Sequence, residues 1–229
     1  MKKFRKLVPA LCMLLVSAVL MGTSTYAWFS MNTNVSAKGM EISAKSDSTF
    51  LVITEGETFD SETVTSITAS TTATKKPLFP VMPVAEFASK TEVETAAKWQ
   101  YAYSSDPGSP TKNGDYVACT DLTNYVASEV FSIGLSKASG LNESVNNIRV
   151  KSVTLPENTG ISCVIVCGDV VKTYTATSTT SLDLKVKATK AGTQVSVYYF
   201  INGDNANVFT NNATNLTGSV EVHFTVDAA

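Results

Sequence analysis

The chain has 229 residues, 18 of them basic and 20 acidic, which gives a formal net charge of −2. A mildly acidic surface repels the phosphate backbone of nucleic acids. The sequence has no cluster of Lys and Arg interleaved with aromatic residues that would offset this repulsion, and nucleic-acid binding is therefore not expected. A chain of this length buries roughly 70% of its unfolded surface as one domain, and we expect one domain after the N-terminal segment.

Residues 1–27 have the order of a secretory signal. Four basic residues in the first six positions precede an apolar run from Leu7 to Met21, and small residues lead to a cleavage point after Ala27. The run of about 15 residues is shorter than the roughly 20 that span a bilayer, which favours cleavage by a signal peptidase during export. The alternative is an uncleaved membrane anchor, because two further uncharged aromatic residues follow. Cleavage leaves residues 28–229 with a net charge of −6.

The first part of the remaining chain has short strand patterns and little helical periodicity. Residues 32–54 predict one or two strands and a turn. Residues 61–76 are rich in Ser and Thr and predict a solvated edge strand or a loop. Residues 77–87 contain three prolines, whose missing N–H donors argue against a central strand. Residues 90–100 predict one or two helical turns.

An aromatic hairpin is predicted next. A strand begins at Trp99, a turn-rich loop follows through residues 106–108 and 113–114, and a second strand leads to residue 120. The alternating aromatic side chains of Trp99, Tyr101 and Tyr103 have two interpretations: an exposed ligand-binding surface, or core.

The rest of the chain consists of short β-rich runs separated by turn residues, a pattern typical of a sandwich or barrel. In residues 194–204, period-two alternation places one set inward: Val195, Val197, Tyr199 and Ile201. In residues 219–228 the inward set is Val220, Val222, Phe224 and Val226. His223 then points to solvent, as an ordinary exposed polar residue.

Cysteine usage is not that of a disulfide scaffold, because Cys12 lies in the signal and three cysteines remain. Cys163 and Cys167 share one face of a predicted strand about 13 Å apart, at ~3.3 Å per residue, too far to bond to each other. Cys119 pairs with one of them, or all three are small buried apolar residues.

No catalytic or metal-binding constellation is found, and we expect neither enzymatic activity nor a cofactor. The chain has a single histidine and no HExxH, CxxC or phosphate-binding loop. The loop of residues 202–218 offers Asp204, Asn205 and Asn207 to calcium, but it lacks the spacing of a calcium-binding hand. A turn-forming loop is the preferred interpretation.

The stretches GTSTYAWFSMNTNVSAKGMEISA (22–44) and VYYFINGDNANVFTNNATNLTGSVEVHFTV (197–226) carry a resemblance to a known family. They resemble the signal, first strand and closing hairpin of the SipW-dependent secreted proteins of Gram-positive bacteria, the TasA/camelysin family. The resemblance implies an all-β, antiparallel jelly-roll-like β-sandwich with short helices in insertions. It also implies a dedicated signal peptidase and export to the cell surface or extracellular matrix.

The resemblance further implies a structural subunit of a biofilm-matrix fibre, formed with copies of itself or with related secreted subunits. Residues 28–42 would be a donor strand that adds to the next subunit. Its candidate anchors are Trp28, Phe29, Val35 and Ile42. The alternative is a monomeric or membrane-anchored cell-surface binding module. The metalloprotease activity attributed to camelysin is not carried over, because the zinc ligands are missing.

Overall fold

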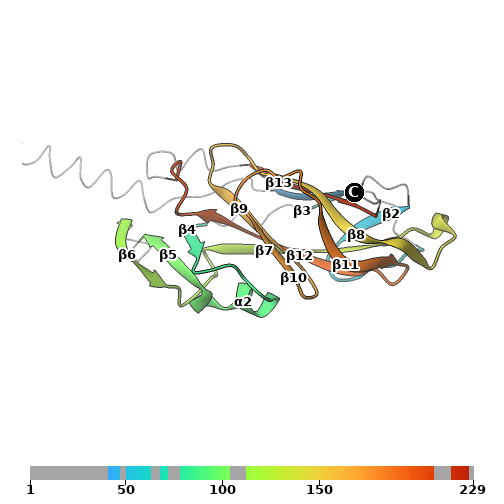
Figure 1. Cartoon of the computed structure of the whole chain (residues 1–229), viewed down its shortest axis with the longest axis horizontal. Coiled ribbons are helices and arrows are strands. Elements are labelled where there is room, and N and C mark those ends of the chain that lie inside the picture. Colours follow the sequence, from blue (N-terminus) through green and yellow to red (C-terminus); the bar gives the residue numbers. More distant parts are fainter. Residues whose placement is uncertain are drawn as a thin grey trace, which may run out of the picture.

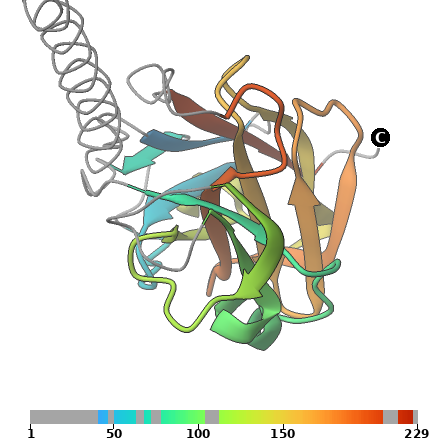
Figure 2. The same ribbon diagram turned by 90° about the vertical axis from the view of Figure 1, so that its left-hand side faces the viewer.

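Strands dominate the protein. The computed structural model describes residues 41–46, 50–62, 68–71, 78–103, 112–208 and 218–226. Their strands form two sheets that pack face to face, as the side view and the end-on view show (Figure 1, Figure 2). The predicted all-β sandwich is therefore confirmed.

The five-stranded sheet has, in spatial order, β11 (Leu182–Thr189), β8 (Glu143–Thr154), β13 (Ser219–Thr225), β1 (Glu41–Ser46) and β3 (Thr68–Thr71). The eight-stranded sheet has the order β10 (Val170–Tyr174), β9 (Ile161–Cys167), β12 (Thr193–Asn202), β4 (Pro80–Pro83), β5 (Trp99–Tyr103) and β6 (Lys112–Ala118). Its other two strands are β7 (Val126–Leu135), which pairs with β12, and β2 (Leu51–Glu55), which pairs with β7.

The connectivity is jelly-roll-like. From β7 to β13 the chain passes from one sheet to the other at most of its connections. Most neighbouring strands are antiparallel, as predicted. Two pairs are parallel instead, β1 with β13 and β12 with β4. Each joins segments far apart in the chain, so no tight turn has to connect them.

The main core lies between the sheets, and strand alternation fills it. In β13, Val220, Val222 and Phe224 are buried, while His223 is only partly buried and lies on the outward side. The alternation predicted for this segment is confirmed except at Thr225, whose side chain is buried as well.

A second core covers the outer face of the eight-stranded sheet. Every residue of β9 is buried, because alternate side chains enter the main core and the second core. In β12, Val197 and Tyr199 belong to the main core, and Tyr198 and Phe200 to the second. Continuous apolar runs are typical of strands covered on both faces.

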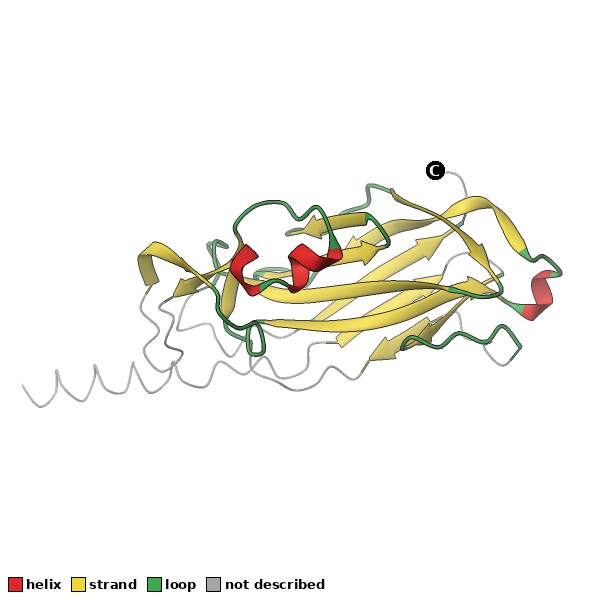
Figure 3. Cartoon of the chain, turned by 90° about the horizontal axis from the view of Figure 1, so that it is seen from below, coloured by secondary structure: helices red, strands yellow, loops and turns green. Residues whose placement is uncertain are grey.

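Two short helices help to form the second core. The helix α2 (Lys90–Glu94) and the 3₁₀ turn η1 (Ala96–Lys98) lie against the outer face of the eight-stranded sheet (Figure 3). A further 3₁₀ turn, η2 (Lys137–Ser139), precedes β8. The hydroxyl of Ser89 accepts the N–H of Glu92, which caps the first turn of α2. The helical turns predicted for residues 90–100 are confirmed.

The proline argument for residues 77–87 was wrong. β4 is an internal strand that pairs with β12 on one side and β5 on the other. It is tolerated because Pro80 and Pro83 stand at its two ends and only two of its residues pair with β12. The predicted hairpin is formed by β5 and β6, but Asn113 and Gly114 lie inside β6 rather than in the loop.

Candidate functional site

Most of the predicted assembly residues lie outside the described part of the chain. Ala27, Trp28, Phe29 and Val35 belong to this undescribed part. Ile42 is described, and its side chain is fully buried in β1, opposite Val220 of β13. The end of the predicted donor segment is therefore a strand of the chain's own sheet, and only residues before Glu41 remain for a partner.

Five sheet edges are candidate surfaces for strand addition. Among the described strands, β2, β3, β6, β10 and β11 each pair on one side only. An edge strand presents unpaired N–H and C=O groups that another chain can bind, unless bulges, prolines or charges block it. The five edges differ in how well they are blocked.

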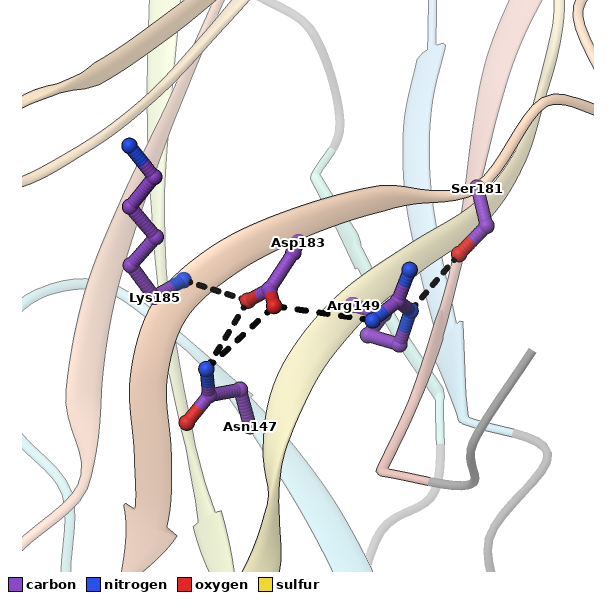
Figure 4. A network of polar contacts seen from close by, with 5 residues as sticks. All are labelled: Asn147, Arg149, Ser181, Asp183 and Lys185. Atoms are coloured by element: carbon purple, nitrogen blue, oxygen red, sulfur yellow. Dashed lines mark hydrogen bonds and ion pairs between the residues drawn. The ribbon is translucent and has the colours of Figure 1, made fainter.

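The β11 edge carries a bulge held by polar contacts (Figure 4). Its register against β8 shifts between Asp183 and Lys187, and Lys185 has a left-handed φ of +59°. The backbone N–H of Lys185 donates to Asp183 Oδ1 at 2.7 Å. A lysine with positive φ is unusual, and this hydrogen bond fixes the turn that produces it.

Side chains from β8 hold the same aspartate. Arg149 Nη1 lies 3.5 Å from Asp183 Oδ2, and the side-chain amide of Asn147 donates to the carboxylate at 3.1 Å (Figure 4). Arg149 Nε also donates to the hydroxyl of Ser181 at 2.9 Å. The hydrogen bond from the backbone N–H of Lys185 contributes most to lowering the pKa of Asp183, and the contacts with Asn147 and Arg149 lower it further. The carboxylate therefore stays charged. A bulged, charged edge resists strand addition.

The β3 edge differs from the β11 edge in sequence and register. Its sequence is Thr-Ala-Ser-Thr, without charge or proline, and it pairs with β1 in regular antiparallel register. Of the two predictions for residues 61–76, an edge strand or a loop, the structure shows a strand at Thr68–Thr71, and residues 63–67 and 72–76 lie outside the described part.

The three cysteines in the described part of the chain are free and buried. Cys163 and Cys167 belong to the main core and Cys119 to the second, on the other face of the sheet. Burial raises the pKa of Cys119 and of Cys163 to about 12, and that of Cys167 to about 11. The sequence left open a disulfide of Cys119 or three small buried apolar residues. The structure shows the second arrangement.

Trp99 and Tyr101 of β5 do not form an exposed binding surface, while the side chain of Tyr103 lies outside what the structure describes. Trp99 is fully buried, packs against Phe87 and Phe200, and donates its indole N–H to the carbonyl of Val93 at 2.7 Å. Tyr101 is 4% exposed and stacks against Tyr125. Their side chains are core, and a ligand surface built on them is excluded.

A cleft of about 380 Å³ opens beside α2, where the turn before β7 and the outer face of β12 meet the helix. Its polar wall includes Glu94, Asp121 and Tyr198. The hydroxyl of Tyr198 donates to Glu94 Oε1 at 2.6 Å. Sequence reasoning missed this site, because Glu94 and Tyr198 are 104 positions apart and neither belongs to a motif.

His223 lies beside Glu221 on β13. Its Nε2 lies 3.6 Å from Glu221 Oε2, and the other oxygen of Glu221 accepts from Lys45 Nζ at 2.8 Å. The hydrogen bond from Lys45 lowers the pKa of Glu221. These side chains link β1 to β13 across the outer face of the five-stranded sheet.

The described ranges hold no group of His, Cys, Asp and Glu arranged to bind a metal ion, and Asp204 of the 202–218 loop is exposed within a turn. Within the same ranges no helix is long and apolar enough to cross a membrane.

Comparison of the chain with protein-family models, curated proteins and solved structures gave no match.

Proposed function

We propose that the protein is a secreted structural subunit of an extracellular fibre or biofilm matrix of the kind formed by the TasA family. In this assembly the N-terminal segment of one subunit, freed by cleavage after Ala27, adds as a strand to an open sheet edge of the next. Backbone hydrogen bonds supply the affinity, and alternate side chains of the added strand fill grooves on the acceptor.

The difference between the two edges of the five-stranded sheet carries this proposal. The β11 edge is bulged and charged, whereas the β3 edge is regular and uncharged. Proteins that remain monomeric generally block their sheet edges. A sheet whose two edges differ in this way is better suited to addition at the regular, uncharged edge, and we assign β3 as the acceptor.

The donor segment is long enough for this role. Residues 28–40 precede β1 and, fully extended at ~3.3 Å per residue, span about 43 Å. The four residues of β3 span only about 13 Å by the same measure. A donor of this length covers the acceptor strand and leaves residues to bridge the gap between subunits. Trp28, Phe29 and Val35 remain its candidate anchors, while Ile42 anchors the chain's own core.

The first test combines mass spectrometry of the protein recovered from its native cell surface with negative-stain images of the same fraction. We expect an N-terminus at Trp28 and filaments. A variant that lacks residues 28–40 is expected to stay monomeric after export. Filaments of normal length from this truncated variant would rule out the donor-strand mechanism.

A second test addresses the acceptor edge. Ser70→Lys places a charge on β3 and is expected to abolish or shorten filaments, because an edge lysine opposes strand pairing. Thr173→Lys makes the matched change on the β10 edge, beside the existing Lys172, and should leave filaments unchanged. The reverse result would move the acceptor to β10.

A second candidate function is a monomeric or membrane-anchored surface module that binds a ligand. The cleft beside α2 favours it, since it offers a binding site that does not depend on assembly. Surface protein that retains Met1 and forms no filaments would support this module over the fibre subunit.

A further inference from the structure

The cleft beside α2 has the size of a small-ligand site and is open to solvent on one side. Its volume of about 380 Å³ lies within the range usual for such sites, roughly 300–1,000 Å³. The cleft is lined by residues of α2 and η1, by residues 120–123, and by residues of β7 together with Tyr198 of β12. Three separate segments of the chain therefore converge on it.

Glu94 is held in place at one side of the cleft. Tyr198 is only 6% exposed, and its hydroxyl donates a hydrogen bond to Oε1 of Glu94. Burial, and then the bond to Glu94, raises the pKa of this tyrosine, so the hydroxyl remains a donor. Lys90 lies 3.8 Å from the same carboxylate oxygen, with both side chains about half exposed. An ion pair this exposed is weak, and it does not cancel the negative charge of Glu94 in the cleft.

Asp121 supplies a second carboxylate. It accepts hydrogen bonds from the hydroxyl of Thr123 at 2.6 Å and from the backbone N–H of the same residue at 3.1 Å. These bonds lower the pKa of Asp121, which keeps it ionised. Within the described part of the chain no cation pairs with Asp121, and no basic side chain lines the cleft.

The remaining lining determines what kind of cation fits. Hydroxyls of Thr120 and Ser128 offer further acceptors, and aliphatic side chains line the rest of the wall: Val93, Ala96, Leu122 and Val126. A bare metal ion would leave this aliphatic surface unused. A sugar usually stacks on an open aromatic face, and the ring of Tyr198 is buried. A charged head with an apolar stem matches both parts of the lining.

We propose that this cleft binds an organic cation with an apolar stem, the chemistry shared by free alkylamines and by lysine or arginine side chains of a polypeptide. The ammonium or guanidinium group donates to Glu94 and Asp121, and the stem packs on the aliphatic wall. This site does not depend on fibre assembly.

The test uses calorimetry of the purified full chain at low salt, supported by chemical-shift mapping. The probes are lysine blocked at both ends as N-acetyl methylamide, the norleucine analogue that lacks only the ammonium group, and n-butylammonium. We expect the lysine probe to bind about tenfold more tightly than norleucine, since a charge-assisted hydrogen bond is lost with the ammonium group. Equal affinity for the two probes, or no binding of either cation, would overturn the proposal.

Variants then locate the binding. Glu94→Gln keeps an acceptor for the Tyr198 hydroxyl and should fold, yet it is expected to weaken the lysine probe about tenfold. Asp121→Asn provides an independent second variant. Glu157→Gln removes the same charge from an exposed loop outside the cleft and should change affinity less than twofold. Unchanged binding in both cleft variants would refute the assignment.

The probes also distinguish the two sources of the cation. Binding of n-butylammonium at the same residues as blocked lysine supports a free amine as a sufficient ligand. Binding of the lysine probe alone supports a polypeptide side chain.

Discussion

Ile42 provides the sharpest test of how the N-terminal segment is divided between the chain's own fold and assembly. Its side chain is fully buried in β1, between β13 and β3. Replacing a buried isoleucine by alanine costs about 2–5 kcal/mol of the free energy of unfolding. In a domain of this size each kcal/mol lowers Tm by about 2–4 °C, so Ile42→Ala is expected to lower Tm by roughly 4–20 °C.

The assay is urea unfolding followed by circular dichroism on protein that has not assembled into filaments. Ile42→Val removes one methylene and should cost only about 0.5–1.5 kcal/mol, which gives a graded series. Val145→Ala is the matched control, because Val145 is 87% exposed and its truncation should stay within about 0.5 kcal/mol. An Ile42→Ala variant with an unchanged unfolding midpoint and lost filaments would refute this reasoning, since it would place Ile42 between subunits.

Three further predictions follow from partly or fully buried groups. Burial and the nearby Glu55 carboxylate raise the pKa of Glu129, so its ionisation costs stability as pH rises above the unfolded value of 4.5. Glu129→Gln should therefore raise Tm at pH 7 and have little effect at pH 4; a larger gain at pH 4 would contradict this. The three buried cysteines should resist a thiol reagent at pH 8 until the protein unfolds, and labelling of the native protein would disprove their burial. Gly134→Ala should cost about 1–3 kcal/mol, because the added Cβ would lie 2.5 Å from the ring of Phe59 and 2.6 Å from a backbone carbonyl. Adding Phe59→Leu should recover only part of that loss in a double-mutant cycle, since the carbonyl remains; full recovery would contradict this.

Local patterns predicted most strands correctly. The period-two alternation in β13 and the turn residues between short apolar runs are strong local signals. The interpretation of residues 77–87 failed because pairing partners are not local. β4 is internal only because β12 and β5, which lie far from each other in sequence, come to either side of it. No pattern within the segment carries that information.

The candidate site was less predictable than the fold. The aromatic residues of β5 had two interpretations from sequence, and the second core decided between them by burying Trp99 and Tyr101. The pairing of Glu94 with Tyr198 depends on packing α2 against β12, which neither segment's sequence specifies. The blocked state of the β11 edge likewise depends on Lys185 taking a left-handed conformation, which its sequence context does not signal.

The parallel pairing of β1 with β13 has a consequence for the order of folding. Lys45 and Glu221 bond across a sequence separation of 176 residues, so β1 and β13, two neighbouring inner strands of their sheet, are the first and the last of the described strands to be synthesised. That sheet cannot close until almost the whole chain has left the ribosome, and contacts this distant in sequence form slowly. A nascent chain whose core is incomplete stays unfolded for longer, which is compatible with the export across a membrane that we propose.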